Sequence, residues 1–213
     1  MDEITIGFQS VVEEICCRDW EQFTQDEMTA VAWAYYFFSI QFRECLEVAL
    51  RLHPEDQQLR RLDREECATA NLSPWPGVAE AKEAMNHDEF MRRTLTLSPI
   101  SLAVQSKLRD AGERYLATTR AMDDYYKAMT IASYECGGLE AVFSAMLRAK
   151  HLDTPLLASF RHFLKKHIAF DSHPEEGHGA LIRHFLPDAR IRPMWVAFRD
   201  LLLVAVPNQA SFD

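Results

Sequence analysis

Residues 30–42 are apolar on nearly every side of a helix, and this limits what the chain can fold into. Apolar side chains cover almost all of its faces and leave no polar stripe that could face water. They include Val31, Trp33, Ala34, Phe37, Phe38, Ile40 and Phe42. Thr24, followed three residues later by Glu27, is typical of a helix N-terminus, and Pro54 ends the pattern. The sequence therefore predicts a helix over about 24–52, buried at the centre of other helices.

Helical periodicity also dominates the remainder of the chain, which has only 7 glycines and shows no alternating strand-like run. We predict further helices over about 4–18, 55–70, 86–96, 98–150, 153 through the region of His167, and 190–206. Asn86 is the expected N-cap of one helix and Pro99 the first-turn residue of the next, with a kink at Gly137-Gly138. These segments predict an all-α fold, a single domain over residues 1–213 built as a bundle of seven to eight helices.

Composition excludes several classes of protein. Apolar residues at 48% and charged residues at 26% are typical of an ordinary globular domain, and no apolar run reaches the roughly 18 residues of a membrane span. An acidic start without a secretory signal, and five cysteines without a CxxC spacing, favour reduced thiols in the cytoplasm. Residues 1–90 carry a net charge of −12 and residues 91–213 one of +3, which together give the −9 of the chain. There is no basic stripe with interleaved aromatics, so we expect no nucleic-acid partner.

The segment 167–178 brings metal-ligand side chains together if it is helical. A helix turns about 100° per residue, so Asp171 falls at roughly 40° and His178 at roughly 20° from His167. Two imidazoles and a carboxylate on one stripe suit iron, manganese or zinc. His173 falls near 240° in a continuous helix, but Pro174 can bend the chain, so His173 stays an alternative to His178. A surface ion pair between His167 and Asp171 is the competing interpretation.

Two other regions carry candidate ligands. Glu65 and Glu66 lie in a highly charged helix where either could be exposed, and we select Glu66. His87 opens a His-Asp-Glu turn that could also be a solvated helix start. Glu135 lies in an apolar stretch, where an unpaired carboxylate needs a metal, a cation or a proton. The full candidate set holds three carboxylates and three imidazoles, enough for two iron ions in a bundle core: Glu66, His87, Glu135, His167, Asp171 and His178.

The order of these residues resembles the heme-oxygenase-like diiron oxidases and oxygenases. That family carries a Glu and then a His on an early helix pair, a Glu on a middle helix, and a late His-xxx-Asp-xx-His. The resemblance covers residues from about 30 to 205 and matches, in turn, Glu66, His87, Glu135, and the set His167, Asp171 and His178. The chain departs from the pattern at Pro174, where the last His is usually found, and in the long spacing from Glu66 to His87, which implies a loop insertion.

The resemblance implies a heme-oxygenase-like helical fold with two Fe(II) per chain as metal cofactor, O2 as co-substrate and a small-molecule substrate. It also implies an external reductant, and a scaffold that often forms homodimers. Known reactions of the family are N-oxygenation of amines, oxidative fragmentation of amino acids and decarboxylative desaturation of fatty acids. We expect a small amine or amino-acid substrate in specialised metabolism, with the fatty-acid reaction as the alternative. A heme oxygenase itself fits poorly, because the first histidine, His53, follows the second helix.

Two other functions stay open. A metal-free enzyme resembling the thiaminase-like hydrolases of the same fold would use Cys136 as nucleophile beside Glu135, although a small buried thiol is the commoner role for such a cysteine. A non-catalytic protein would use its acidic N-terminal half to bind a partner and would hold no metal. Replacing Cys136 by Ser would inactivate only the hydrolase, and replacing His167 by Ala would leave the partner-binding protein unaffected.

Overall fold

Every regular element in the described part of the chain is helical. The computed structural model describes all residues except 1–6, 67–73, 172, 174 and 207–213. The α-helices, in chain order, are α1 (Phe8–Cys16), α2 (Gln25–Leu52), α3 (Gln57–Glu66), α5 (His87–Leu97), α6 (Leu102–Arg120), α7 (Asp124–Ser133), α8 (Leu139–Met146), α9 (Ala158–Asp171), α10 (His178–Ile182) and α11 (Arg192–Ala205). The all-α prediction is confirmed, although the described residues form more α-helical segments than the seven or eight expected.

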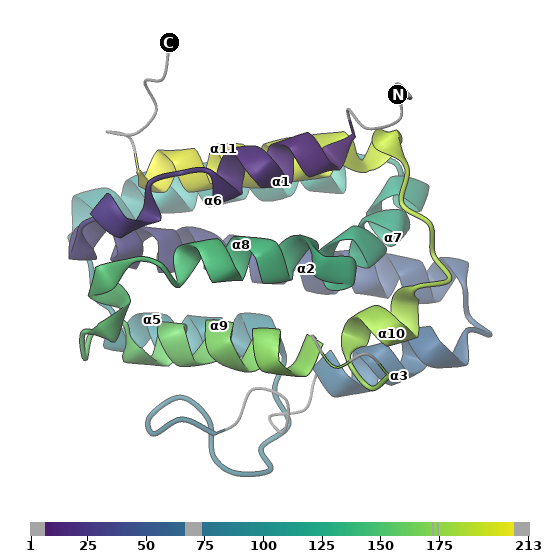
Figure 1. The fold of residues 1–213 in the computed structure, drawn as a ribbon, viewed down its shortest axis with the longest axis horizontal. Coiled ribbons are helices and arrows are strands. Elements are labelled where there is room, and N and C mark those ends of the chain that lie inside the picture. The colour runs from purple at the N-terminus through teal and green to yellow at the C-terminus, as the bar shows by residue number, and fades with distance from the viewer. Residues whose placement is uncertain (1–6, 67–73, 172, 174, 207–213) are drawn as a thin grey trace.

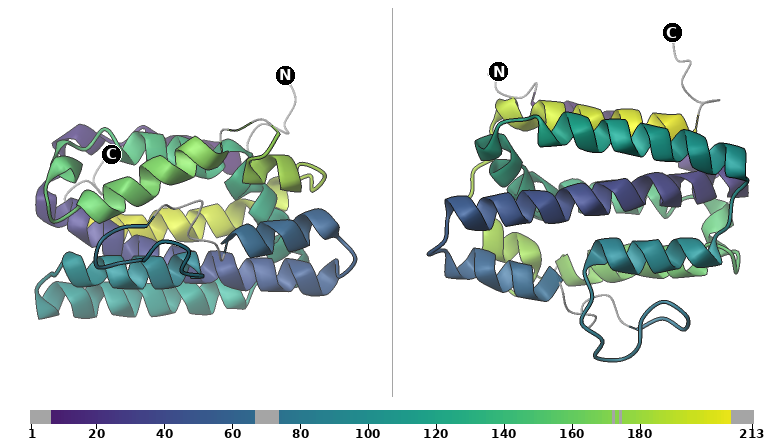
Figure 2. Two further views of the ribbon diagram at one scale, coloured as in Figure 1. Left: turned by 90° about the horizontal axis from the view of Figure 1, so that it is seen from below. Right: turned by 180° about the vertical axis from the view of Figure 1, so that it is seen from behind.

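The long helix α2 passes through the middle of the bundle, as its apolar sequence predicts (Figure 1). It packs against α5, α6, α7 and α11, and the view from behind shows it between α6 and α5 (Figure 2). Its N-terminus is the predicted capping box: the Thr24 hydroxyl accepts from the Glu27 amide at 3.2 Å, and the Glu27 carboxylate accepts from the Thr24 amide at 2.9 Å. No helix in the described residues is long and apolar enough to cross a membrane.

Several helices end or begin at residues that the apolar periodicity of the sequence does not mark. The segment predicted as one helix over 98–150 is divided at 121–123, where the Asp123 carboxylate caps α7. Its start is at Leu102 and not at Pro99, because the Ser101 hydroxyl caps α6. A 3-10 turn (Lys150–Asp153) precedes α9, so α9 begins five residues later than predicted. These local caps outweigh the apolar pattern that continues across them.

Helices at the lower edge of Figure 1 supply most of the candidate ligands. There α9 lies in front of α5, and α10 lies in front of α3. The helix predicted over 55–70 is seen to Glu66, and its remainder lies outside the described residues. The predicted N-cap Asn86 does precede α5, but its side chain makes no capping hydrogen bond to the helix.

The predicted kink at Gly137-Gly138 is a π-helical turn (Tyr134–Gly138) that joins α7 to α8. Gly137 has a φ of +99°, a backbone conformation that favours glycine. A π-helical turn inserts an extra residue into a helix and often occurs at functional sites. Cys136 and Gly137 have non-helical backbone angles here, so α7 and α8 meet at a kink directly after Glu135, which is buried.

Candidate metal centre

The six side chains singled out in the sequence come together from five separate segments. Glu66 is the last residue of α3, His87 the first of α5, Glu135 lies in the π-helical turn, and His178 is the first residue of α10. His167 and Asp171 lie on the last turn of α9. All six are largely withdrawn from solvent, with His178 only 1% exposed. The sequence therefore identified residues that the fold places at one buried site.

One half of the site is centred on the His178 ring. Its Nδ1 lies 2.9 Å from Glu66 Oε1, 3.3 Å from Asp171 Oδ1 and 3.4 Å from Glu135 Oε2. Ligand atoms of Glu66, Glu135 and His178 lie within 4.8 Å of one another. We call the group of Glu66, Glu135, Asp171 and His178 the carboxylate-rich half.

The other half is centred on the His87 ring. Its Nδ1 lies 2.8 Å from Glu66 Oε2 and 3.2 Å from His167 Nε2. We call the group of Glu66, His87 and His167 the histidine-rich half. The two oxygens of Glu66 face different halves, so this single carboxylate joins them.

The separations of 3.2–3.4 Å fit coordination of metal ions, and the two Glu66–imidazole distances, 2.8 Å and 2.9 Å, are slightly shorter, as in hydrogen bonds. Nitrogen and oxygen ligands about 2.1 Å from an ion lie roughly 3.0–3.4 Å from one another in octahedral or tetrahedral geometry. Buried Glu135 Oε2 and Asp171 Oδ1 have no hydrogen-bond donor of good geometry among the described residues. Such oxygens are costly to bury unless a cation binds them. The donor set of imidazole and carboxylate suits Fe(II), Mn(II) or Zn(II).

The His167 ring is oriented by the backbone. Its Nδ1 lies 3.2 Å from the Phe163 carbonyl oxygen, four residues earlier in the same helix, and donates to it. That hydrogen bond leaves Nε2, which faces His87, without a proton and free to bind a metal. Burial, followed by the charge of His87, lowers the pKa of His167 well below its usual value and keeps the ring neutral.

Charges in the carboxylate-rich half shift one another strongly. Burial lowers the pKa of the His178 imidazole, but the neighbouring carboxylates Glu66 and Glu135 outweigh burial and raise the pKa to about 11. Burial raises the pKa of Glu135, and burial followed by the charge of Glu135 raises the pKa of Asp171 well above its usual value. For Glu66, burial is outweighed by His87 and His178, which lower its pKa. In the metal-free protein, a proton on His178 thus supplies a positive charge that a metal ion can replace.

The helical stripe of 167–178 does not continue as one helix. Helix α9 ends at Asp171, and His178 reaches the site as the first residue of a separate helix, α10. The prediction of His178 is therefore supported by the geometry, but the reason given for it, a continuous helix, is wrong. His173 is exposed, and its Nδ1 accepts from the Glu176 amide at 3.0 Å, so it belongs to the turn between the helices.

The structure also distinguishes between the alternatives for His167 with Asp171 and for Glu65 and Glu66. His167 and Asp171 are not a surface pair, since both lie in the buried site and the closest ion-pair partner of Asp171 is His178. Glu66 is the buried member of its pair, whereas the Glu65 side chain is 24% exposed and binds Arg61 at 2.6 Å. Glu65 Oε2 still lies 3.8 Å from His178 Nε2, on the outer side of that ring.

The two residues after His87 separate from it. Asp88 pairs with Arg43 of α2 at 3.0 Å, and Glu89 pairs with Arg92 and Arg93 on its own helix. His87 alone turns into the bundle interior. Asp88 and Glu89 therefore form the solvated side of this helix start, and His87 forms the side that faces the candidate metal centre.

Cys136 lies next to Glu135 but does not share its surroundings. Its side chain is exposed, and the Sγ lies 3.8 Å from the Gly179 carbonyl oxygen. Partial removal of the thiol from water, followed by the charge of Glu135, raises the pKa of Cys136. A nucleophilic cysteine needs a lowered pKa, so this environment disfavours the hydrolase mechanism.

Helix α2 covers the site from the other side. A cavity of about 10 Å³, room for about one water molecule, lies between α2 and the ligands. The α2 residues that line it are Tyr35, Phe38, Ser39 and Phe42, with Leu139 from α8. The sequence predicts these aromatic residues as part of a buried central helix, and it carries no signal that marks Ser39 as a residue of the cavity.

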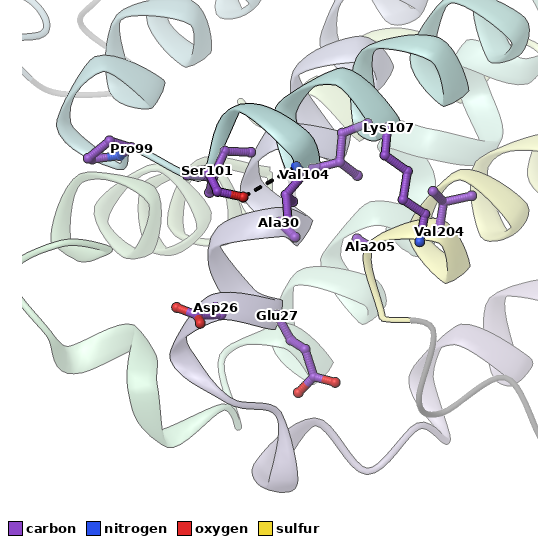
Figure 3. Close-up of a pocket in the computed structure, with 11 residues that line it drawn as sticks. Asp26, Glu27, Ala30, Pro99, Ser101, Val104, Lys107, Val204 and Ala205 are labelled. Carbon is purple, nitrogen blue, oxygen red and sulfur yellow. Dashed lines mark hydrogen bonds between the residues drawn. The ribbon is translucent and has the colours of Figure 1, made fainter.

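A larger cavity, of about 410 Å³, lies away from these ligands (Figure 3). It is lined by the first turns of α2 and α6 and the end of α11, and by none of the six candidate ligands. Asp26 and Glu27 lie on one side of it and Lys107 on another, with apolar side chains such as Ala30 and Val104 between them (Figure 3). Size alone therefore does not identify the chemical site of this protein.

Comparison of the chain with protein-family models, with curated proteins and with solved structures finds no match in any of the three. The functional argument therefore depends on the geometry of the site.

Proposed function

We propose that the protein is a non-heme iron oxidase or oxygenase that holds two Fe(II) ions and uses O2 to oxidise a small amine or amino acid. The single observation that carries the proposal is the position of Glu66, whose two oxygens lie 2.8 Å and 2.9 Å from imidazole nitrogens of two different halves of one buried site. A carboxylate placed in this way can bridge two ions. Bound ferrous iron supplies the one-electron and oxygen chemistry that protein side chains lack.

Each half would hold one ion with a different ligand set. His87 and His167, with Glu66 Oε2, would hold an ion mainly through nitrogen. Glu135, Asp171 and His178, with Glu66 Oε1, would hold the other mainly through oxygen. The lower imidazole content of the second set makes it the weaker site for Fe(II) by general ligand preference.

The surrounding side chains exclude water and orient the ligands. Phe163 packs on the His167 ring with centroids 4.2 Å apart, and Phe170 packs on the His178 ring at 4.6 Å. These rings and the α2 aromatics leave room for about one water molecule beside the ligands and so exclude bulk water from the site.

The lining of the cavity favours an amine over a fatty acid. Apart from the ligands it presents Tyr35, Phe38, Phe42, Ser39 and Leu139, none of which is cationic. Aromatic faces attract an ammonium group, whereas the carboxylate of a fatty acid, like that of an amino acid, would find no Lys or Arg partner here, so the lining favours a simple amine most. The cavity has room for about one water molecule, so any substrate requires its lining to move, and a long acyl chain requires the largest movement. Decarboxylation of a fatty acid remains the second candidate reaction of the same site.

The test is an anaerobic titration of metal-free protein with ferrous iron, followed by exposure to O2. We expect about two iron ions per chain and consumption of O2 by the loaded protein. Glu66→Gln removes the bridging charge and should lower the iron content, whereas Glu47→Gln changes an exposed carboxylate that pairs with Arg43 on the same helix and should leave the iron content unchanged. About one ion per chain would restrict the proposal to one half of the site, and no binding above background would refute it.

A further inference from the structure

One tryptophan connects the candidate metal centre with the α1 face of the bundle. Trp195 of α11 is fully buried, and its indole packs against the π-helical turn that carries Glu135. A Cβ on Gly138 would lie 2.7 Å from the Trp195 ring, so this close approach requires glycine. The Tyr134 ring, one residue before the ligand Glu135, has its centroid 5.0 Å from that of Trp195.

Further rings extend the contact in both directions. Toward the site, Phe38 lies 5.0 Å from Tyr134 and 5.3 Å from Tyr35, and both Phe38 and Tyr35 line the cavity beside the ligands. Toward the surface, the half-buried Phe8 of α1 stacks on Trp195 at 6.1 Å with an interplanar angle of 15°. Aromatic side chains in mutual contact are an efficient medium for electron transfer through protein.

The hydrogen bond of the indole suits a one-electron carrier. Trp195 Nε1 donates to Ser133 Oγ at 2.9 Å, and that hydroxyl donates onward to the Thr130 carbonyl at 2.7 Å. An indole can lose an electron and keep its N–H proton in such a bond. A phenol must release its proton when oxidised, but the Tyr134 hydroxyl donates to Gln41 Oε1, an amide oxygen that does not act as a base.

We propose that Trp195 is the residue through which electrons from an external one-electron donor reach the metal centre. This inference rests on the proposed function. In each transfer one electron leaves the indole and reduces the oxidised centre by one electron. The indole radical cation then takes one electron from the donor, which is oxidised by one electron. No bond forms or breaks, and the indole proton stays on Nε1.

The experiment follows the radical and not the turnover. Iron-loaded full-length protein is mixed with O2 without donor or substrate, frozen at successive times, and examined by electron paramagnetic resonance, with iron measured in the same samples. We expect a tryptophan radical whose signal narrows when the indole is ring-deuterated and disappears when ascorbate is added as donor. The signal should be lost in Trp195→Phe. The signal should persist in Trp20→Phe. Trp20 is a matched control because it too is buried and its Nε1 donates a hydrogen bond to the Ile15 carbonyl oxygen.

A second set of variants covers the case in which Trp195→Phe fails to fold or to bind iron. The chain has four tryptophans, so persistence of the signal in Trp20→Phe, Trp33→Phe and Trp75→Phe assigns it to Trp195. Ser133→Ala keeps the indole and should alter the hyperfine pattern. If iron binds but the radical is absent, is a tyrosine, or survives in Trp195→Phe, the relay is refuted and the iron site is not. Absence of iron in the wild-type protein refutes both proposals.

Discussion

At the scale of single residues, the site is governed by the cost of burying charge. Three carboxylates share a buried space with one imidazole, His178, and two of them, Glu66 and Glu135, outweigh the effect of burial and raise its pKa to about 11. Its proton is the positive charge that makes the metal-free arrangement tolerable. A metal ion would provide the same compensation with more charge, so metal binding should displace this proton.

The stability of metal-free protein should therefore fall as the pH rises. Because the pKa of His178 is higher in the folded chain than its usual 6.5, the folded chain holds an extra proton between pH 6.5 and about 11. The resulting stability is complete below pH 6.5 and is lost as the pH rises toward 11, by at most about 1.4 kcal/mol per pH unit. The free energy of unfolding by urea, measured with chelator at pH 7.5 and 9.5, tests this.

Two variants isolate the contribution of His178 from other groups that titrate in this range. His178→Gln, which cannot take up a proton, should show a smaller loss of stability between the two pH values. His173→Gln changes an exposed histidine of the same segment and should behave as wild type. Equal slopes in all three proteins would contradict the assignment.

At the scale of elements, short interruptions of helices do the positioning. The π-helical turn turns Glu135 inward, and the break between α9 and α10 brings His178 back toward Asp171. The two interruptions meet at Gly179, where a Cβ would lie 2.7 Å from the Glu135 carbonyl oxygen. Beyond α10, His184 Nε2 pairs with Asp56 Oδ2 at 2.5 Å and ties this segment to the start of α3.

Gly179→Ala should therefore separate α10 from the π-helical turn. We expect a loss of about 1–3 kcal/mol in the free energy of unfolding, as for other overpacked sites. We also expect weaker binding of the ion in the carboxylate-rich half. Calorimetry of metal binding and urea unfolding measure the two effects.

Gly112→Ala is the matched control for this change. Its Cβ would lie 2.3 Å from the Phe37 ring, in the contact between α6 and α2. It should reduce stability without changing the number of ions bound. If Gly179→Ala affected stability alone, as this control does, α10 would have no role in holding the metal.

At the scale of the whole molecule, the site connects elements that are distant in the sequence. Segments as far apart as residues 66 and 178 each supply a ligand, and of these segments α9 and α10 alone follow each other through a short connection. The aromatic residues of α2 and α9 fill the space around this connection, with Tyr35 in contact with Phe143 and Phe163. Metal binding should therefore stabilise the fold and not only one loop.

The melting temperature should rise with the concentration of ferrous iron under anaerobic conditions. When the free concentration of the ion is 100 times its Kd, binding adds about 2.7 kcal/mol to the free energy of unfolding. Scanning calorimetry of wild type and of Glu66→Gln measures the effect, which we expect to be largely lost in the variant. A melting temperature that does not respond to iron or to chelator would argue against a metal site.

The sequence by itself determined the helical class, the central position of α2 and four of the six clustered residues, His87, Glu135, His167 and Asp171, and it left two candidates for each of the other two positions. These follow from local rules: apolar periodicity, capping residues such as Thr24, and the high cost of an unpaired carboxylate at Glu135. The family resemblance ordered the same six residues along the chain, and the structure brings them together.

The tertiary structure alone decided the alternatives that local rules leave open. It buried Glu66 and left Glu65 partly exposed, brought His178 to the site and left His173 outside, and directed Cys136 away from Glu135. Each outcome depends on the residue at which a helix ends and on the face of the helix that packs against the rest of the bundle. Contacts between distant segments set both, and they outweigh the small local preferences that a sequence pattern records.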